Sequence, residues 1–115
     1  MIEVNKEMIS KERVDEWVAK WESLNANIFA AHDCRDGSAE GLMQQGIELF
    51  EAFIVEASQS DDEFHINADY EIMPINGMER IQFIKARPGQ YACYRQLDEL
   101  FKETKKRCAR LRLKK

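Results

Sequence analysis

Three long stretches of this chain place apolar residues at steps of three and four, which is the spacing of one face of an α-helix. These stripes run over Val14–Ala31, Ala39–Ala57 and Cys93–Leu111. The 115 residues include only two prolines and five glycines, so each stretch can remain helical over its whole length. The sequence therefore predicts an all-α fold, a small helical bundle of three long helices and one short helix. We expect one domain over residues 1–115, with no sheet of more than two strands.

The first half of the chain predicts two of the long helices. The first is expected over about residues 11–32, with Ser10 as its N-cap. Trp17 and Trp21 lie on its apolar stripe and should anchor the core, because tryptophan buries a large area. The second is expected over about 39–58, capped by Asp36 or Ser38. Its apolar face is wider than a single seam, so it should pack against two neighbours.

The second half predicts the short helix and the last long one. Asn76, followed three residues later by Glu79, resembles a capping box and predicts a helix over about 77–85. The pair Arg87-Pro88 should end it, because a residue before proline avoids the helical region. Pro88 suits the first turn of the last helix, which should continue to about Leu113.

Residues 59–75 alternate apolar and polar side chains, a period of two. An isolated pair of strands would be only marginally stable. We therefore expect an ordered loop that lays its apolar residues on the bundle, with a short helix as the alternative.

Charge is distributed very unevenly along the chain. Residues 102–115 hold eight Lys or Arg and one Asp or Glu, a net charge of +7, whereas residues 1–101 carry −11. The dipole of a helix C-terminus is complemented by one or two cations. The excess indicates contact with an anionic partner or with the chain's own acidic body. The candidate partner-binding residues are Lys105, Lys106, Arg107, Arg110, Arg112, Lys114 and Lys115.

The partner of this basic end is expected to be a protein, because a chain with a pI near 5.3 is a poor nucleic-acid binder overall. Weak, sequence-tolerant binding of nucleic acid is the alternative. If half the basic end reached phosphates at once, log affinity would fall against log salt with a slope of roughly −3 to −4. No aromatic residue follows Phe101, so base stacking is not indicated. The oligomeric state is left open.

A second candidate site lies at the bend between the short helix and the last helix. It comprises Arg80, Arg87, Tyr91 and Arg95, whose guanidinium and phenol groups could bind an anion, a carboxylate or a nucleotide. Such a site would make the chain a small ligand-binding protein or an enzyme. Alternatively, the arginines pair with nearby carboxylates.

No recognisable set of catalytic or metal-ligating residues is present. Two histidines and three scattered cysteines do not form a four-ligand site, so we expect no catalytic residues, no metal and no cofactor. Cys34 lies near His32 and is a candidate reactive thiol, with an incidental role as the alternative. The odd number of cysteines indicates a reducing compartment. No signal peptide and no apolar run of about 20 residues is present, so we expect a cytoplasmic protein without a membrane span.

Residues 74–101 carry a family resemblance. They resemble the C-terminal part of the YpoC-like family of Bacillus and its relatives, through Pro74, Asn76, Glu79-Arg80, Arg87-Pro88 and Gln96-Leu97. The resemblance implies a small all-helical protein and supplies no catalytic residues. The charge pattern and the lack of a recognisable catalytic set favour a non-enzymatic interaction or adaptor module.

Overall fold

The computed structural model describes residues 1–59 and 63–114. Within these ranges lie one short 3-10 helix and four α-helices: η1 (Lys6–Ile9), α1 (Lys11–Cys34), α2 (Ala39–Glu56), α3 (Gly77–Ala86) and α4 (Tyr91–Leu113). The extended pairings in the described chain are two isolated bridges, Ile2 with Tyr70 and Val4 with Ser58. The predicted all-α bundle of three long helices and one short helix is confirmed.

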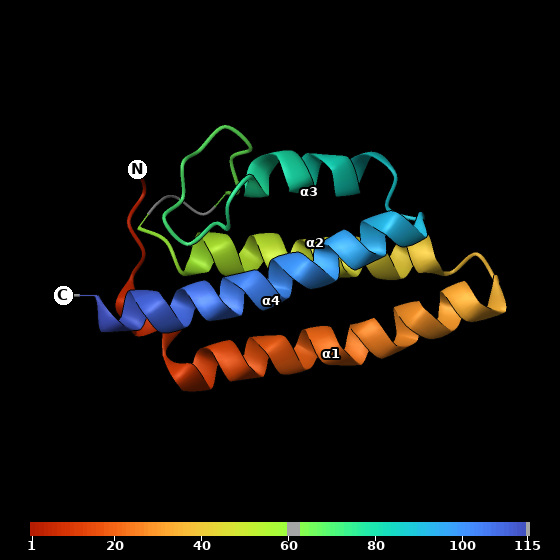
Figure 1. The fold of residues 1–115 in the computed structure, drawn as a ribbon, viewed down its shortest axis with the longest axis horizontal. Helices are drawn as coiled ribbons and strands as arrows, with labels where there is room; N and C mark the ends of the chain where they lie inside the picture. The colour runs from red at the N-terminus through yellow and green to blue at the C-terminus, as the bar shows by residue number, and fades with distance from the viewer. Residues whose placement is uncertain (60–62, 115) are drawn as a thin grey trace.

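The three long helices run side by side, and α3 covers α2 and α4 on the side away from α1 (Figure 1). α1 runs opposite to both α2 and α4, which share one direction, so α1 and α4 are antiparallel (Figure 1). The start of α1 and the end of α4 therefore meet at one end of the bundle. This arrangement places the basic end of the chain beside residues that come almost 100 positions earlier.

The core is organised around the two tryptophans of α1. Trp21 is 1% exposed and stacks on Phe101 with ring centroids 4.4 Å apart. Trp17 stacks on Phe53 at 4.1 Å. The backbone of α2 comes so close at Gly46 that a Cβ there would lie 2.7 Å from the Trp21 ring. These contacts confirm that both tryptophans anchor the core and that α1, α2 and α4 share it.

The ends of α1 and α2 differ little from the prediction. The Ser10 hydroxyl accepts a hydrogen bond from the Arg13 N–H at 3.3 Å, so Ser10 caps α1 as expected. Ser38 holds the N-cap position of α2, but its side chain makes no capping bond. Its hydroxyl instead donates to the Asp36 carboxylate at 2.6 Å. Neither Asp36 nor Ser38 therefore acts as the expected side-chain cap.

The expected capping box at the start of α3 is wrong. Asn76 has φ 55°, in the left-handed region, and its side chain makes no capping bond. It is the third residue of a turn in which the Gly77 N–H donates to the Pro74 carbonyl at 2.9 Å. Asparagine is one of the few residues that tolerate this conformation, so the turn, and not a cap, explains it.

Pro88 does not lie in the first turn of α4, which begins three residues later at Tyr91. Residues 87–90 form a turn in which the Gln90 N–H donates to the Arg87 carbonyl at 3.1 Å. Proline suits the second position of such a turn because its φ is already fixed near the required value. The sequence therefore predicted the helix break correctly but placed the restart too early.

The segment before α3 is an ordered loop over its described residues, 63–75, as predicted; residues 60–62 of the prediction lie outside the described residues. Tyr70, Ile72 and Met73 are buried in the core, and Phe64 packs half-buried against it. The loop is also tied to the N-terminal segment, because the Glu71 N–H donates to the Ile2 carbonyl at 2.9 Å.

Candidate partner-binding surface

Three cations of the candidate partner-binding set are bound to the chain itself. Arg107 donates to the Glu71 carbonyl at 2.6 Å, and Lys114 pairs with the Glu71 carboxylate at 3.0 Å. Arg112 donates to the Ile9 carbonyl at 2.7 Å. These contacts fix the end of α4 to the loop and to η1. The basic end is therefore partly a structural element that folds back on its own chain.

Glu71 is the centre of this attachment. It is only 7% exposed, and its carboxylate also accepts a hydrogen bond from the Val4 N–H at 3.0 Å. The hydrogen bonds from Val4 and Lys114 hold the pKa of Glu71 below its ordinary value, against the effect of its burial. One buried carboxylate thus joins the N-terminal segment, the loop and α4. Sequence reasoning missed it, because its partners are 67 and 43 positions away.

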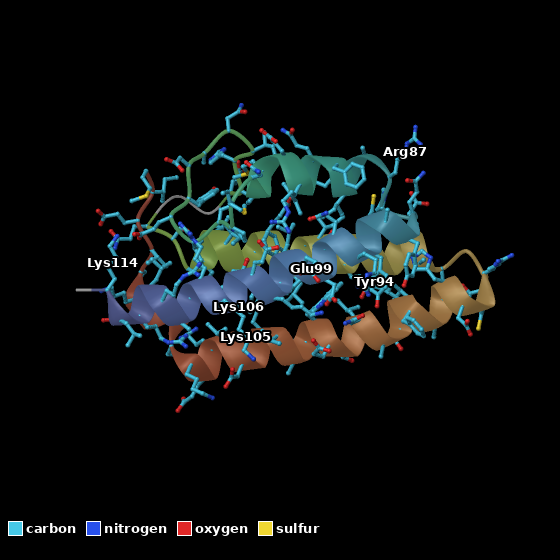
Figure 2. All side chains as sticks on the ribbon, in the orientation of Figure 1. Arg87, Tyr94, Glu99, Lys105, Lys106 and Lys114 are labelled. Carbon is cyan, nitrogen blue, oxygen red and sulfur yellow. The ribbon has the colours of Figure 1, made fainter. Side chains whose placement is uncertain are left out.

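Three other cations of the candidate set are free on the surface. Lys105, Lys106 and Arg110 are exposed, and in the described chain none of them makes a hydrogen bond or an ion pair. Figure 2 shows Lys105 and Lys106 on the C-terminal half of α4, where it runs along α1. Lys115 lies outside the described residues. The structure thus divides the predicted set into a bound group and an exposed group.

A groove of about 370 Å³ lies between the first turns of α1 and the C-terminal half of α4. Its apolar lining residues are Val14 of α1 and Ala109 of α4. Asp15 and five cations complete its lining: Lys11, Lys102, Lys105, Lys106 and Arg112. We call this feature the α1–α4 groove.

Sequence reasoning did not place Lys11 and Lys102 at this site. Lys11 contributes because α1 and α4 are antiparallel, which brings the first residue of one helix to the end of the other. The amphipathic patterns of the two helices could have suggested that they pack together. They do not specify which turn of α1 meets which turn of α4.

Two of the groove's cations are already paired with carboxylates of the chain. Lys11 pairs with Asp15 at 2.7 Å, and Lys102 pairs with Asp98 at 2.9 Å. The hydrogen bond from Lys11 lowers the pKa of Asp15, with Lys105 adding a smaller effect through its charge. Asp15 therefore stays anionic and is neutralised by Lys11. The positive charge offered to a partner comes mainly from Lys105 and Lys106.

The residues of the second candidate site, at the bend between α3 and α4, do not come together in the structure. Arg80 forms a bidentate ion pair with Glu103 and also donates from Nε to the Gln96 side chain at 2.6 Å. The hydrogen bond from Arg80 to Glu103 holds the pKa of Glu103 below its ordinary value. The Arg80 side chain is only 19% exposed, so Arg80 holds α3 against α4.

The other three residues of that group point elsewhere. Arg87 is exposed and extends away from the bundle beyond the end of α3 (Figure 2). At about 1.5 Å of rise per residue, it lies roughly 10 Å from Arg80 along the helix axis. Arg95 is exposed, and the half-exposed Tyr91 packs edge-on against His32 with ring centroids 5.3 Å apart. The structure does not bring Arg80 together with Arg87.

A buried polar network that the sequence did not reveal connects α1 to α4. Asp98 is 5% exposed and accepts hydrogen bonds from Trp21 Nε1 at 2.9 Å and from Asn25 at 3.3 Å. Asn25 in turn accepts a hydrogen bond from the Tyr94 hydroxyl. Burial raises the pKa of Tyr94, so its phenol stays protonated and donates. The network fixes the separation of the two helices that form the groove.

All three cysteines are free thiols. Cys93 and Cys108 are buried, and burial raises the pKa of Cys108 to about 12. Cys34 is exposed at the end of α1. Over the described ranges, no three His, Cys, Asp or Glu side chains are grouped so that they could share a metal ion. No helix in those ranges has the length and apolar character to cross a membrane.

The fold and this surface define a small helical-bundle protein with a cationic groove at one end. A family model described as YpoC-like protein matches residues 11–115, and the chain belongs to that family. It is 54% identical over 37 residues to the protein described as Uncharacterized protein YpoC from Bacillus subtilis (strain 168). That match covers 32% of this chain and 23% of the relative, less than a quarter of its length. No solved structure matches the chain.

Proposed function

We propose that this chain is a non-enzymatic interaction or adaptor module that binds an anionic protein partner through the exposed cations of α4. The observation that carries the proposal is the free state of Lys105 and Lys106 on a chain whose first 101 residues hold 20 acidic side chains. Cations needed only for folding would be expected to contact some of those carboxylates. Lys114 makes such a contact with the Glu71 carboxylate, and Arg107 and Arg112 donate to backbone carbonyls.

The needs of the helix itself do not account for Lys105 and Lys106. The dipole at the end of α4 is complemented by Arg110 and Arg112 in its last turn. Lys105 and Lys106 lie about two turns earlier, where that interaction has faded. Free surface lysines contribute little to stability, typically less than about 0.5 kcal/mol. Their presence on an exposed face therefore supports a role in binding.

A protein partner is favoured over nucleic acid. Three free cations neutralise about three phosphates, which corresponds to a salt slope of only roughly −3 on duplex DNA. The acidic remainder of the chain would repel a long phosphate backbone. An acidic protein face needs a much smaller contact area. The three free thiols further support the cytoplasmic location that belongs to this proposal.

The alternative is a ligand site at the bend, and it has less support. Arg80 is occupied by Glu103 and Gln96, and Arg87 lies beyond the far end of α3.

The test compares two double charge reversals of equal size. Lys105→Glu with Lys106→Glu alters the proposed surface, and Arg87→Glu with Arg95→Glu alters the bend. Each immobilised protein is exposed to extract of the source cells at low salt, and the retained proteins are eluted with salt and identified by mass spectrometry. We expect the Lys105/Lys106 variant alone to lose a partner retained by the unaltered chain.

If only the Arg87/Arg95 variant lost the partner, the binding function would be assigned to the bend. If both variants lost the partner equally, only the total charge of the chain would matter. If both variants retained the partner, an electrostatic partner surface would be rejected.

A further inference from the structure

The α1–α4 groove combines two properties in one place, an apolar lining and a cationic surround. From this combination we infer that the groove binds an acidic amphipathic segment of a partner protein. Its small apolar side chains would contact Val14 and Ala109, and its carboxylates would contact Lys105 and Lys106. The inference rests on the proposed function and names the kind of partner.

The apolar part of the groove lies low between the two helices. Val14 is only 2% exposed and lines the groove, so it forms part of the groove floor. Ala109 is exposed and carries no side chain beyond Cβ, which leaves room above it. Lysine stems can lie along apolar surface while their ammonium groups stay in water. The stems of Lys102 and Lys105 therefore extend the apolar contact available to a ligand.

The cationic part selects the charge of the ligand. Lys11 and Lys102 are paired with Asp15 and Asp98, whereas Lys105 and Lys106 have no such partner in the described chain. Asp15 is the acidic residue among those that line the groove, and Lys11 already neutralises it. Exposed ion pairs contribute only about 0.2–1 kcal/mol each. The apolar contact must therefore supply a large part of the affinity, so an acidic segment without apolar side chains would bind poorly.

The shape of the groove favours the side chains of a helix over a small-molecule ligand. Small-molecule pockets are concave and bury most of the ligand's surface. This groove of about 370 Å³ is instead open between two antiparallel helices, an arrangement into which a third amphipathic helix can be laid. Such a helix presents apolar residues at steps of three and four. A phosphate backbone offers no apolar group for Val14 and Ala109 to contact, which argues against nucleic acid.

The test begins with an unbiased selection. A displayed library of random 16-residue peptides is selected against the full chain, and the enriched peptides are synthesised. We expect them to carry several Asp or Glu residues and apolar residues at steps of three and four. Peptide affinity is then measured by fluorescence anisotropy, with a mixed-sequence DNA duplex as a second probe. Backbone amide shifts of the protein show where each probe binds and that each variant is folded.

Three single variants then distinguish binding in the groove from binding that depends only on the net charge of α4. Lys105→Glu should weaken peptide binding about tenfold or more, because it reverses a cation at the groove. Ala109→Gln should weaken it similarly without a change of charge, because the longer side chain occupies the groove and glutamine suits a helix. Arg110→Glu is the matched control: it makes the same charge change on α4, but lies about 140° around the helix from Lys105. It should weaken binding less than about threefold.

Each other outcome overturns the inference. Enriched peptides without the acidic amphipathic pattern would do so, and so would tighter binding of the duplex than of any selected peptide. Equal weakening by Lys105→Glu and Arg110→Glu, with no effect of Ala109→Gln, would reject the groove but leave the proposed cationic surface intact. If none of the three substitutions weakened peptide binding, both the groove and the proposed cationic surface would be rejected.

Discussion

Removal of residues 105–115 should destabilise the whole bundle, although the segment resembles a dispensable charged tail. Cys108 is 0% exposed and Leu111 is 9% exposed, so both belong to the core. Truncation of a buried leucine alone costs about 2–5 kcal/mol. The hydrogen bonds from Arg107 and Arg112 to backbone carbonyls add about 1 kcal/mol each. The expected loss is at least about 5 kcal/mol, the lower end of the total stability of a domain of this size.

Thermal unfolding followed by circular dichroism measures this loss. At roughly 4 °C per kcal/mol, we expect residues 1–104 to melt at least about 20 °C below the full chain, or to show no cooperative transition. Leu111→Ala should lower Tm by about 10 °C, and the control Lys105→Ala by less than about 2 °C. A 1–104 chain that melts within about 5 °C of the full chain would refute the assignment of the end of α4 to the core.

Three further changes test the packing. Trp21→Ala should lower the free energy of unfolding by about 3–5 kcal/mol in urea denaturation, and a loss below about 1 kcal/mol would show that Trp21 is not in the core. Gly46→Ala should destabilise by about 1–3 kcal/mol through contact with the Trp21 ring, whereas Gly41→Ala on the same helix meets open space and should be neutral or stabilising; the reverse order would contradict the close approach of α2. The pKa of Glu71 is lowered on folding, so its carboxylate stabilises the protein above its ordinary pKa of 4.5 and less as pH falls through the lower folded value. Glu71→Gln should therefore flatten the fall of stability below pH 4.5, and an unchanged pH profile would show that the charge of Glu71 is not involved.

Much of the fold was predictable because burial leaves a periodic mark on the sequence. The stripe around Trp17 and Trp21 located α1 to within about two residues, the usual disagreement at helix ends. The stripe from Cys93 to Leu111 located the end of α4, whereas its start was predicted three residues too early. The errors fell where the backbone leaves the helix. At Asn76 and Pro88 the same residue types suit a turn as well as a helix start, and the tertiary contacts around them decide between the two.

The candidate site was only half predictable. The excess of basic residues was visible in the sequence, but their division into bound and free cations was not. Arg107, Arg112 and Lys114 have partners in the loop and η1, and those partners are defined only by the packing of distant segments. Lys11 joined the groove for the same reason. A net charge counts cations, whereas a binding surface depends on which of them remain free.

The most direct test of the cationic surface is site-specific photo-crosslinking in the source cells. A benzoyl-phenylalanine replaces exposed Leu113, one turn beyond Ala109 on α4 and outside the groove lining, in one strain, and exposed Gln45 on α2 in a control strain. After irradiation, the account predicts a discrete protein adduct from position 113 that is absent from position 45 and is lost when Lys105→Glu and Lys106→Glu are added. The same adduct from both positions, or an adduct at 113 that survives the two charge reversals, would contradict the claim that the free cations of α4 bind the partner.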